Sequence, residues 1–214
     1  MKCTEANFLK DIAGHQMKVL SDTGVHRYIR CQKPGTWCFG FHIITWPGAL
    51  CIDGDMGTFV FRRLDDMFEF FRTDRREGKP GKQLYINKGY WAEKCVSDSR
   101  YKGLQEFDPD LFRENVVRRY KDWLESRRDE FSAAVRRDLR EQLRNDVLGA
   151  ADEGKHNAIT AALEFRHKET RFNLDDFYEC NTRSYTFHFV WCLYAIAWAI
   201  KQYDETKATA DCHV

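Results

Sequence analysis

Alternating apolar and polar residues in the first third of the chain predict a series of short β-strands. The apolar positions of each run are mostly β-branched or aromatic, and a turn rich in Gly, Pro or Asp separates each run from the next. The runs cover residues 17–20, 25–31, 37–46, 49–52 and 58–61. Five short strands joined by tight turns are typical of an antiparallel meander, so we expect one sheet here.

Helical spacing replaces strand alternation in the rest of the chain. Apolar residues in the segment 64–71 recur at intervals of three and four, which predicts an amphipathic helix. A second helix is expected to begin at Asp108, a good N-cap, and charged helices are expected over 130–148 and 155–168. The segment 187–200 is nearly all apolar but too short to cross a bilayer, which predicts a central buried helix.

Together these patterns predict an α+β fold. An antiparallel β-meander of about five strands in the N-terminal third is expected to pack against a mainly helical C-terminal half. Residues 1–100 form the sheet region with flanking helices, and residues 101–214 form the helical region. We expect the two regions to make one continuous domain.

Composition and charge exclude several classes of protein. The 34 basic and 33 acidic residues leave a net charge of +1, which excludes a histone-like protein and an acidic DNA mimic. No apolar run of about 18 residues and no signal-peptide core is present, so we expect a cytoplasmic protein that does not associate with membranes. The eight cysteines form no C-x-x-C pair, so we expect reduced thiols, no bound metal and no cofactor.

The turn after the fourth predicted strand contains the most concentrated group of candidate catalytic residues. Asp53 and Asp55 stand one residue apart in a glycine-rich turn, and His42 lies on the third predicted strand. Paired carboxylates can bind a divalent cation, so these residues would serve a metal-dependent hydrolase acting on a nucleotide or nucleic acid. Asp and Gly also dominate tight turns for purely structural reasons, and we favour that interpretation. The turn lacks the further ligands of a calcium-binding loop.

A basic cluster follows the sheet and is the candidate for binding a partner or nucleic acid. It begins after the last predicted strand and includes two nearby aromatic residues. Its members are Arg62, Arg63, Arg72, Arg75, Arg76, Lys79, Lys82, Tyr90 and Trp91. Positive charge can hold a phosphate backbone or an acidic protein face, and aromatic rings can stack on bases. Acidic residues interleave with the cluster, however, so a solvated surface of weak ion pairs is the alternative.

Several segments of the chain carry a family resemblance. Residues 44–48, 54–61, 66–71, 86–94 and 185–198 resemble a family of small proteins encoded by bacteriophages and prophages. The resemblance covers most of the chain but carries over no catalytic or binding residue. It implies a phage accessory protein acting in the cytoplasm of the bacterial host, where such proteins often disable CRISPR or other defence complexes.

Two functional hypotheses follow. The first is a phage-encoded anti-CRISPR or similar host-defence inhibitor that binds a bacterial host protein or nucleoprotein complex, with nucleic acid as a further ligand. The alternative is the metal-dependent hydrolase at Asp53 and Asp55. We favour binding over catalysis, because none of the common catalytic motifs occurs. A narrow apolar stripe along the helix expected at 130–148 would also allow a homodimer.

Overall fold

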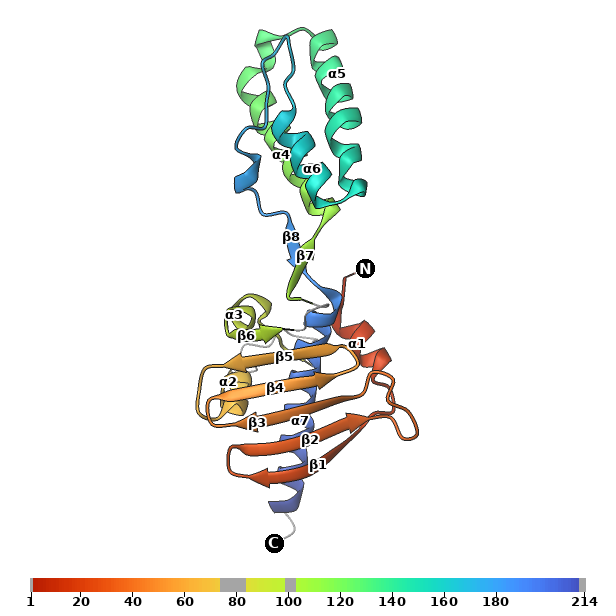
Figure 1. Cartoon of the computed structure of the whole chain (residues 1–214), viewed down its shortest axis with the longest axis vertical. Helices are drawn as coiled ribbons and strands as arrows, with labels where there is room; N and C mark the ends of the chain where they lie inside the picture. The colour runs from red at the N-terminus through yellow and green to blue at the C-terminus, as the bar shows by residue number, and fades with distance from the viewer. Residues whose placement is uncertain (1, 74–83, 99–102, 212–214) are drawn as a thin grey trace. The chain divides into compact units, whose positions relative to one another are not determined.

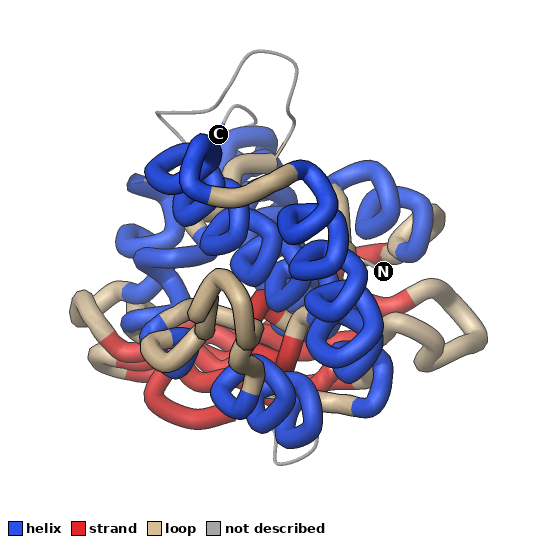
Figure 2. The backbone as a smooth tube through the Cα atoms, turned by 90° about the horizontal axis from the view of Figure 1, so that it is seen from above, coloured by secondary structure: helices blue, strands red, loops and turns tan. Residues whose placement is uncertain are grey.

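The chain forms two compact units, each described here by itself. The computed structural model describes residues 2–73, 84–98 and 103–211. Unit 1 combines residues 1–104 with residues 185–214, and unit 2 is residues 105–184. The C-terminal helix thus belongs with the sheet and not with the other helices. The expected regions 1–100 and 101–214, joined in one continuous domain, stay a prediction. Figure 1 labels the elements, and Figure 2 colours them by type.

A six-stranded antiparallel sheet dominates unit 1, and its strands follow one another in chain order (Figure 1). The strands are β1 (Gln16–Thr23), β2 (His26–Gln32), β3 (Phe41–Trp46), β4 (Ala49–Gly54), β5 (Gly57–Arg62) and β6 (Cys95–Asp98). The predicted α+β meander is thus confirmed. Two details differ. β6 was not predicted, and β3 begins at Phe41 and not at residue 37, because residues 37–40 form a turn closed by the Gly40 N–H bonding the Trp37 carbonyl.

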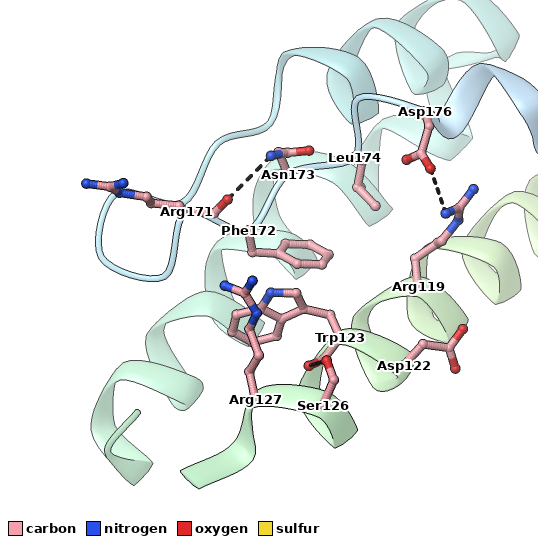
Figure 3. A pocket seen from close by; sticks show the side chains of 10 residues that line it. All are labelled: Arg119, Asp122, Trp123, Ser126, Arg127, Arg171, Phe172, Asn173, Leu174 and Asp176. Atoms are coloured by element: carbon pink, nitrogen blue, oxygen red, sulfur yellow. Dashed lines mark hydrogen bonds and ion pairs between the residues drawn. The ribbon is translucent and has the colours of Figure 1, made fainter. Parts of the chain in front are cut away.

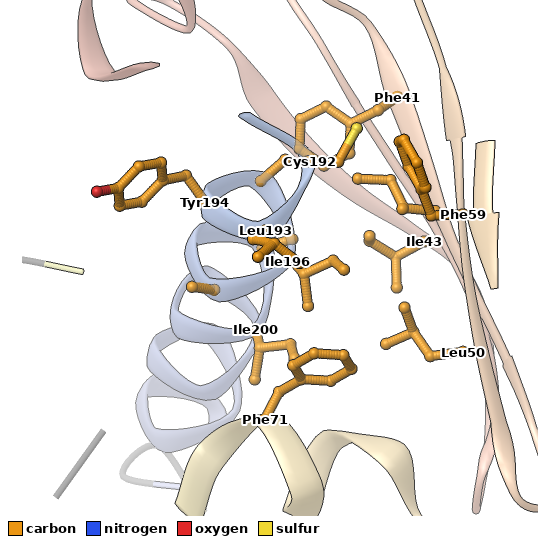
Figure 4. Close-up of a cluster of buried hydrophobic side chains, with 14 of the residues drawn as sticks. Phe41, Ile43, Leu50, Phe59, Phe71, Cys192, Leu193, Tyr194, Ile196 and Ile200 are labelled. Carbon is orange, nitrogen blue, oxygen red and sulfur yellow. The ribbon is translucent and has the colours of Figure 1, made fainter. Parts of the chain in front are cut away.

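The long helix α7 (Phe187–Asp211) covers one face of this sheet. Ile196 is fully buried, as are Ile43 and Leu50 of the sheet, and Figure 4 shows these side chains facing one another. Aromatic rings extend the core at both ends of the helix: Phe8 lies 5.1 Å from Trp191 between ring centroids. Apolar burial on this scale is the main stabilising term of a domain.

Three shorter helices complete unit 1. They are α1 (Glu5–Asp11), α2 (Met67–Thr73) and α3 (Lys88–Glu93). The amphipathic helix predicted over 64–71 is present as α2 but begins at Met67, and Leu64 before it is exposed. Met67, Phe68 and Phe71 are buried as the pattern predicts. No helix within the described residues is long and apolar enough to cross a membrane.

A buried ion pair ties β2 to the start of α2. Arg27 is only 8% exposed, and its two terminal nitrogens each donate a 2.8 Å hydrogen bond to Asp66. The guanidinium also lies 4.5 Å from the ring centroid of Phe68. Burial alone would raise the pKa of Asp66, but the hydrogen bonds from Arg27 and the Phe68 N–H outweigh it and hold that pKa below its usual value.

Unit 2 is helical, with a two-stranded ladder at its ends. Its helices are α4 (Pro109–Arg127), η2 (Arg128–Glu130), α5 (Ala133–Gln142), η3 (Leu143–Leu148), η4 (Gly149–Glu153), α6 (Lys155–Glu164) and η5 (Phe177–Glu179). The strands are β7 (Gln105–Phe107) and β8 (Arg183–Tyr185). Asp108 caps α4 as predicted, because its carboxylate accepts from the N–H groups of Asp110 and Leu111.

The helix expected over 130–148 differs from its prediction in two ways. It begins at Ala133, where Ser132 accepts from the Val135 N–H, and it continues as the π-helix η3. Leu139 and Val147, members of the apolar stripe, are fully buried in the core of unit 2. Phe131 and Val135, at the start of the stripe, are half-buried, so most of the stripe belongs to the core and the homodimer stays a prediction.

Candidate functional site

One face of the sheet in unit 1 is left open. Helices α1, α2 and α7 lie on one side of the strands, and within unit 1 no described helix lies on the other (Figure 1). We define the open sheet face as the side chains of Lys18, Tyr28, Arg30, Trp37, His42, Ile44, Trp46, Cys51, Asp53, Thr58, Val60 and Arg62. Tyr28 and Trp37 are 37% and 41% exposed, which is high for large aromatic residues.

Strand register explains the order of side chains on this face. Tyr28 pairs with Ile44, Ile44 with Cys51, and Cys51 with Val60, so these four side chains form a row across the sheet. Residues opposite one another on antiparallel strands lie close enough for their side chains to pack. The open sheet face therefore has a continuous, largely apolar row across its centre.

Three aromatic rings cluster at one edge of that row. His42 lies 5.2 Å from Tyr28 and 4.9 Å from Trp37 between ring centroids. Burial lowers the pKa of His42, an effect that Asp53 opposes and Arg30 reinforces. His42 is therefore neutral at pH 7 and acts as a packing surface for the two exposed rings.

The turn that carries Trp37 is held by contacts that sequence alone did not show. Phe39 has a positive φ of 56°, and its N–H donates a 2.9 Å hydrogen bond to Asp55. A Cβ on Gly40 would lie 2.7 Å from the ring of Trp37, so only glycine allows the ring to lie where it does. Asp55 therefore orders the turn that presents Trp37.

The two predicted catalytic carboxylates have separate structural partners. Asp53 accepts a 2.6 Å hydrogen bond from the hydroxyl of Thr58, whereas Asp55 accepts from Phe39. His42 and Asp53 are register neighbours on β3 and β4, as the hairpin predicts. Within the described residues, however, no three His, Cys, Asp or Glu side chains come together in a way that could hold a metal ion. The structure thus favours the interpretation of this turn as scaffold.

The described members of the predicted basic cluster have different surroundings. Arg72 bonds Asp204 of α7 at 2.6 Å and so ties two helices together. Trp91 is fully buried with its ring 4.7 Å from that of Phe71, which corrects its proposed role in stacking on a ligand. Tyr90 remains 38% exposed. Arg75, Arg76, Lys79 and Lys82 lie outside the described residues.

Arg62 and Arg63 are exposed, and Arg62 lies on the open sheet face. With Lys18 and Arg30 it gives that face three cations against the carboxylate of Asp53, whose hydrogen bond from Thr58 is described above. The apolar row is therefore flanked by positive charge.

Unit 2 contains a separate polar hollow of about 460 Å³ between α4 and the segment 171–176. Figure 3 shows the rings of Trp123 and Phe172 together, and the ring centroids are 5.3 Å apart. Arg119 is paired with Asp176 at 2.9 Å at one side. The lining holds three arginines and two aspartates, so the hollow has a mixed charge that points to no one class of ligand.

Comparison of the chain with protein-family models, with curated proteins and with solved structures found no match. Function must therefore be argued from the geometry. The feature of the open sheet face that sequence reasoning missed is the exposed pair Tyr28 and Trp37. A signal for the open sheet face as a whole was present in β3, where apolar residues occur at inward and outward positions alike, as expected for a strand that is covered on both faces.

Proposed function

We propose that this protein is a binding protein and that it docks a partner protein on the open sheet face. The observation that carries the proposal is the uncovered apolar row and its aromatic edge, where Tyr28 and Trp37 are exposed; Trp46, on the same face, is half-buried. Contiguous exposed apolar surface is characteristic of interaction sites, and Trp, Tyr and Arg are enriched among the residues that dominate binding energy.

Charge indicates the kind of partner. Lys18, Arg30 and Arg62 flank the apolar row, so the complementary surface has an apolar centre and an acidic rim. The family resemblance supplies the setting: a phage accessory protein that binds and inhibits a bacterial host complex, such as a CRISPR or other defence system, in the host cytoplasm. We do not propose the hydrolase, because Asp53 and Asp55 are each engaged within the scaffold.

The test is affinity capture of tagged protein from a bacterial lysate, with and without nuclease, using two variants. Tyr28→Ala/Trp37→Ala removes the exposed rings of the open sheet face. Tyr178→Ala is the matched control, because Tyr178 is a 69% exposed aromatic residue of unit 2. We expect a stoichiometric complex with a protein partner that persists after nuclease treatment. The control variant should retain this partner, and the affinity of the double variant for it should be at least tenfold lower.

Two results would overturn the proposal. Capture that the double variant retains in full would remove the open sheet face as the docking site. Capture that nuclease abolishes would identify nucleic acid, and not a protein, as the ligand. Circular dichroism of the variants must match the parent protein, so that a loss of binding is not a loss of folding.

A further inference from the structure

Unit 2 contains an apolar groove that the proposed function does not use. It lies between α4 and the segment formed by α5 and η3, and its volume is about 430 Å³. Val117 and Leu124 line it from α4, and Leu148 lines it from η3. All three are only half-buried. Hollows of a few hundred Å³ with apolar walls are typical of sites for small molecules.

The groove owes part of its shape to η3. This segment is a π-helix of six residues that follows α5 directly, and it supplies Leu143, Arg144 and Leu148 to the wall. π-Helical turns are rare and occur frequently at functional sites. The wall is thus formed by a local departure from α-helical geometry.

The rim of the groove is cationic. Lys121, Arg140 and Arg144 lie along it and are exposed, and no acidic residue is among its lining residues. None of the three has an ion pair within the part of the chain that the structure describes. An anionic group at the rim would therefore meet cationic side chains that are not held in an ion pair with a described carboxylate.

The wall also contains an unsatisfied polar atom. Tyr120 is 8% exposed, and its hydroxyl has no hydrogen-bond partner among the described residues. Buried hydroxyl groups usually have a partner, so Tyr120 is an exception. The oxygen is itself covered, so a molecule lying in the groove would not contact it as the wall stands.

We propose that this groove binds a single-chain anionic amphiphile, of the class of a medium-chain fatty-acid carboxylate. The apolar walls take the hydrocarbon chain, and Lys121, Arg140 and Arg144 hold the head group. A helix of about 10 Å diameter laid along the nine residues from Val116 to Leu124 would fill a cylinder of about 1,060 Å³. That is more than twice the volume of the groove, so size favours a single chain over a partner helix.

The experiment is calorimetric titration with dodecanoate below its critical micelle concentration. Dodecyltrimethylammonium, with the same chain and a positive head group, tests the sign of the charge. The variant Arg140→Glu/Arg144→Glu reverses the rim, and Arg137→Glu is the control, because Arg137 is an exposed residue of α5 outside the groove. Vesicles of phosphatidylcholine with phosphatidylglycerol test whether a membrane headgroup is the ligand instead.

We expect dodecanoate to bind at one saturable site, at least tenfold more tightly than dodecyltrimethylammonium. The rim variant should lose at least tenfold in affinity while its unfolding midpoint and the affinity of the control stay unchanged. Absence of saturable binding, equal binding of the cationic amphiphile, or an unchanged affinity in the rim variant would overturn the proposal. Binding to vesicles without binding of dodecanoate would overturn it as well.

Discussion

The buried ion pair between Arg27 and Asp66 should stabilise unit 1, and the extent of its burial sets how large the effect is. Asp66→Asn removes the charge opposite a guanidinium that is 8% exposed and leaves one of the two oxygen acceptors. Removing one partner of a buried pair lowers the free energy of unfolding by about 3–5 kcal/mol. Because Asp66 is 22% exposed, we expect a loss at the lower end, about 3 kcal/mol. With an m-value of about 2 kcal/mol/M in urea, the unfolding midpoint falls by about 1.5 M.

The pH dependence of this loss identifies its cause. The pKa of Asp66 lies below its ordinary value of 3.8, so the stabilisation is fully present above that value. It is lost as the pH falls from there through the lower pKa of the folded state. The difference in free energy of unfolding between the parent protein and Asp66→Asn should therefore be full at pH 7 and shrink toward about pH 3.

Urea unfolding followed by tryptophan fluorescence is the assay. Trp123 is the one tryptophan of the sequence that belongs to unit 2, so the signal reports mainly on unit 1. Asp65→Asn makes the same charge change at an exposed neighbour and should alter stability by less than about 0.5 kcal/mol. A loss in Asp66→Asn below about 0.5 kcal/mol at pH 7, or one that stays constant to about pH 3, would refute the reasoning.

Two further substitutions test other parts of the structure. Gly54→Ala places a Cβ 2.3 Å from the backbone oxygen of Gly40 and should destabilise unit 1 by about 2–3 kcal/mol. Gly89→Ala is the control, because its Cβ meets open space in α3 and should not destabilise the protein. Equal thermal unfolding of the two variants would contradict this prediction. Tyr120→Phe should leave unit 2 as stable as before or slightly more stable, because the Tyr120 hydroxyl has no described partner. Tyr203→Phe removes a 2.9 Å hydrogen bond to Asp22 and should lower the free energy of unfolding by about 1 kcal/mol in a denaturant titration. A clear loss of stability in Tyr120→Phe would show that its hydroxyl is satisfied.

The meander was predictable because its signals are local. Alternation along each strand and the turn residues between strands act within a few positions of one another. β6 was not predictable in the same way: Cys95–Asp98 is short and mostly exposed, and it is a strand because it pairs with the edge of β5. The position of α7 also depends on distant residues, since an apolar helix does not specify in its own sequence which surface it will cover.

The same distinction between local and long-range signals applies to the candidate sites. The proximity of His42 and Asp53 follows from a hairpin and was within reach of the sequence. The burial of Trp91 was not, because an aromatic residue beside basic residues looks alike whether its ring packs inward or outward. The groove in unit 2 depends on a π-helical turn and on the packing of two helices, and neither has a pattern that periodicity reveals.

The turn before β3 is the strongest argument that the open sheet face is more than incidental exposure. Phe39 directs its ring inward, where it stacks on Trp191 with 5.8 Å between centroids, while Trp37 two residues earlier packs on His42 outside. The positive φ of Phe39 and its bond to Asp55 fix both rings at once. An exposed ring held in this way loses little conformational freedom when a partner binds, so more of its contact energy contributes to affinity. A Trp37 that served only as turn filler would need no such attachment to the core.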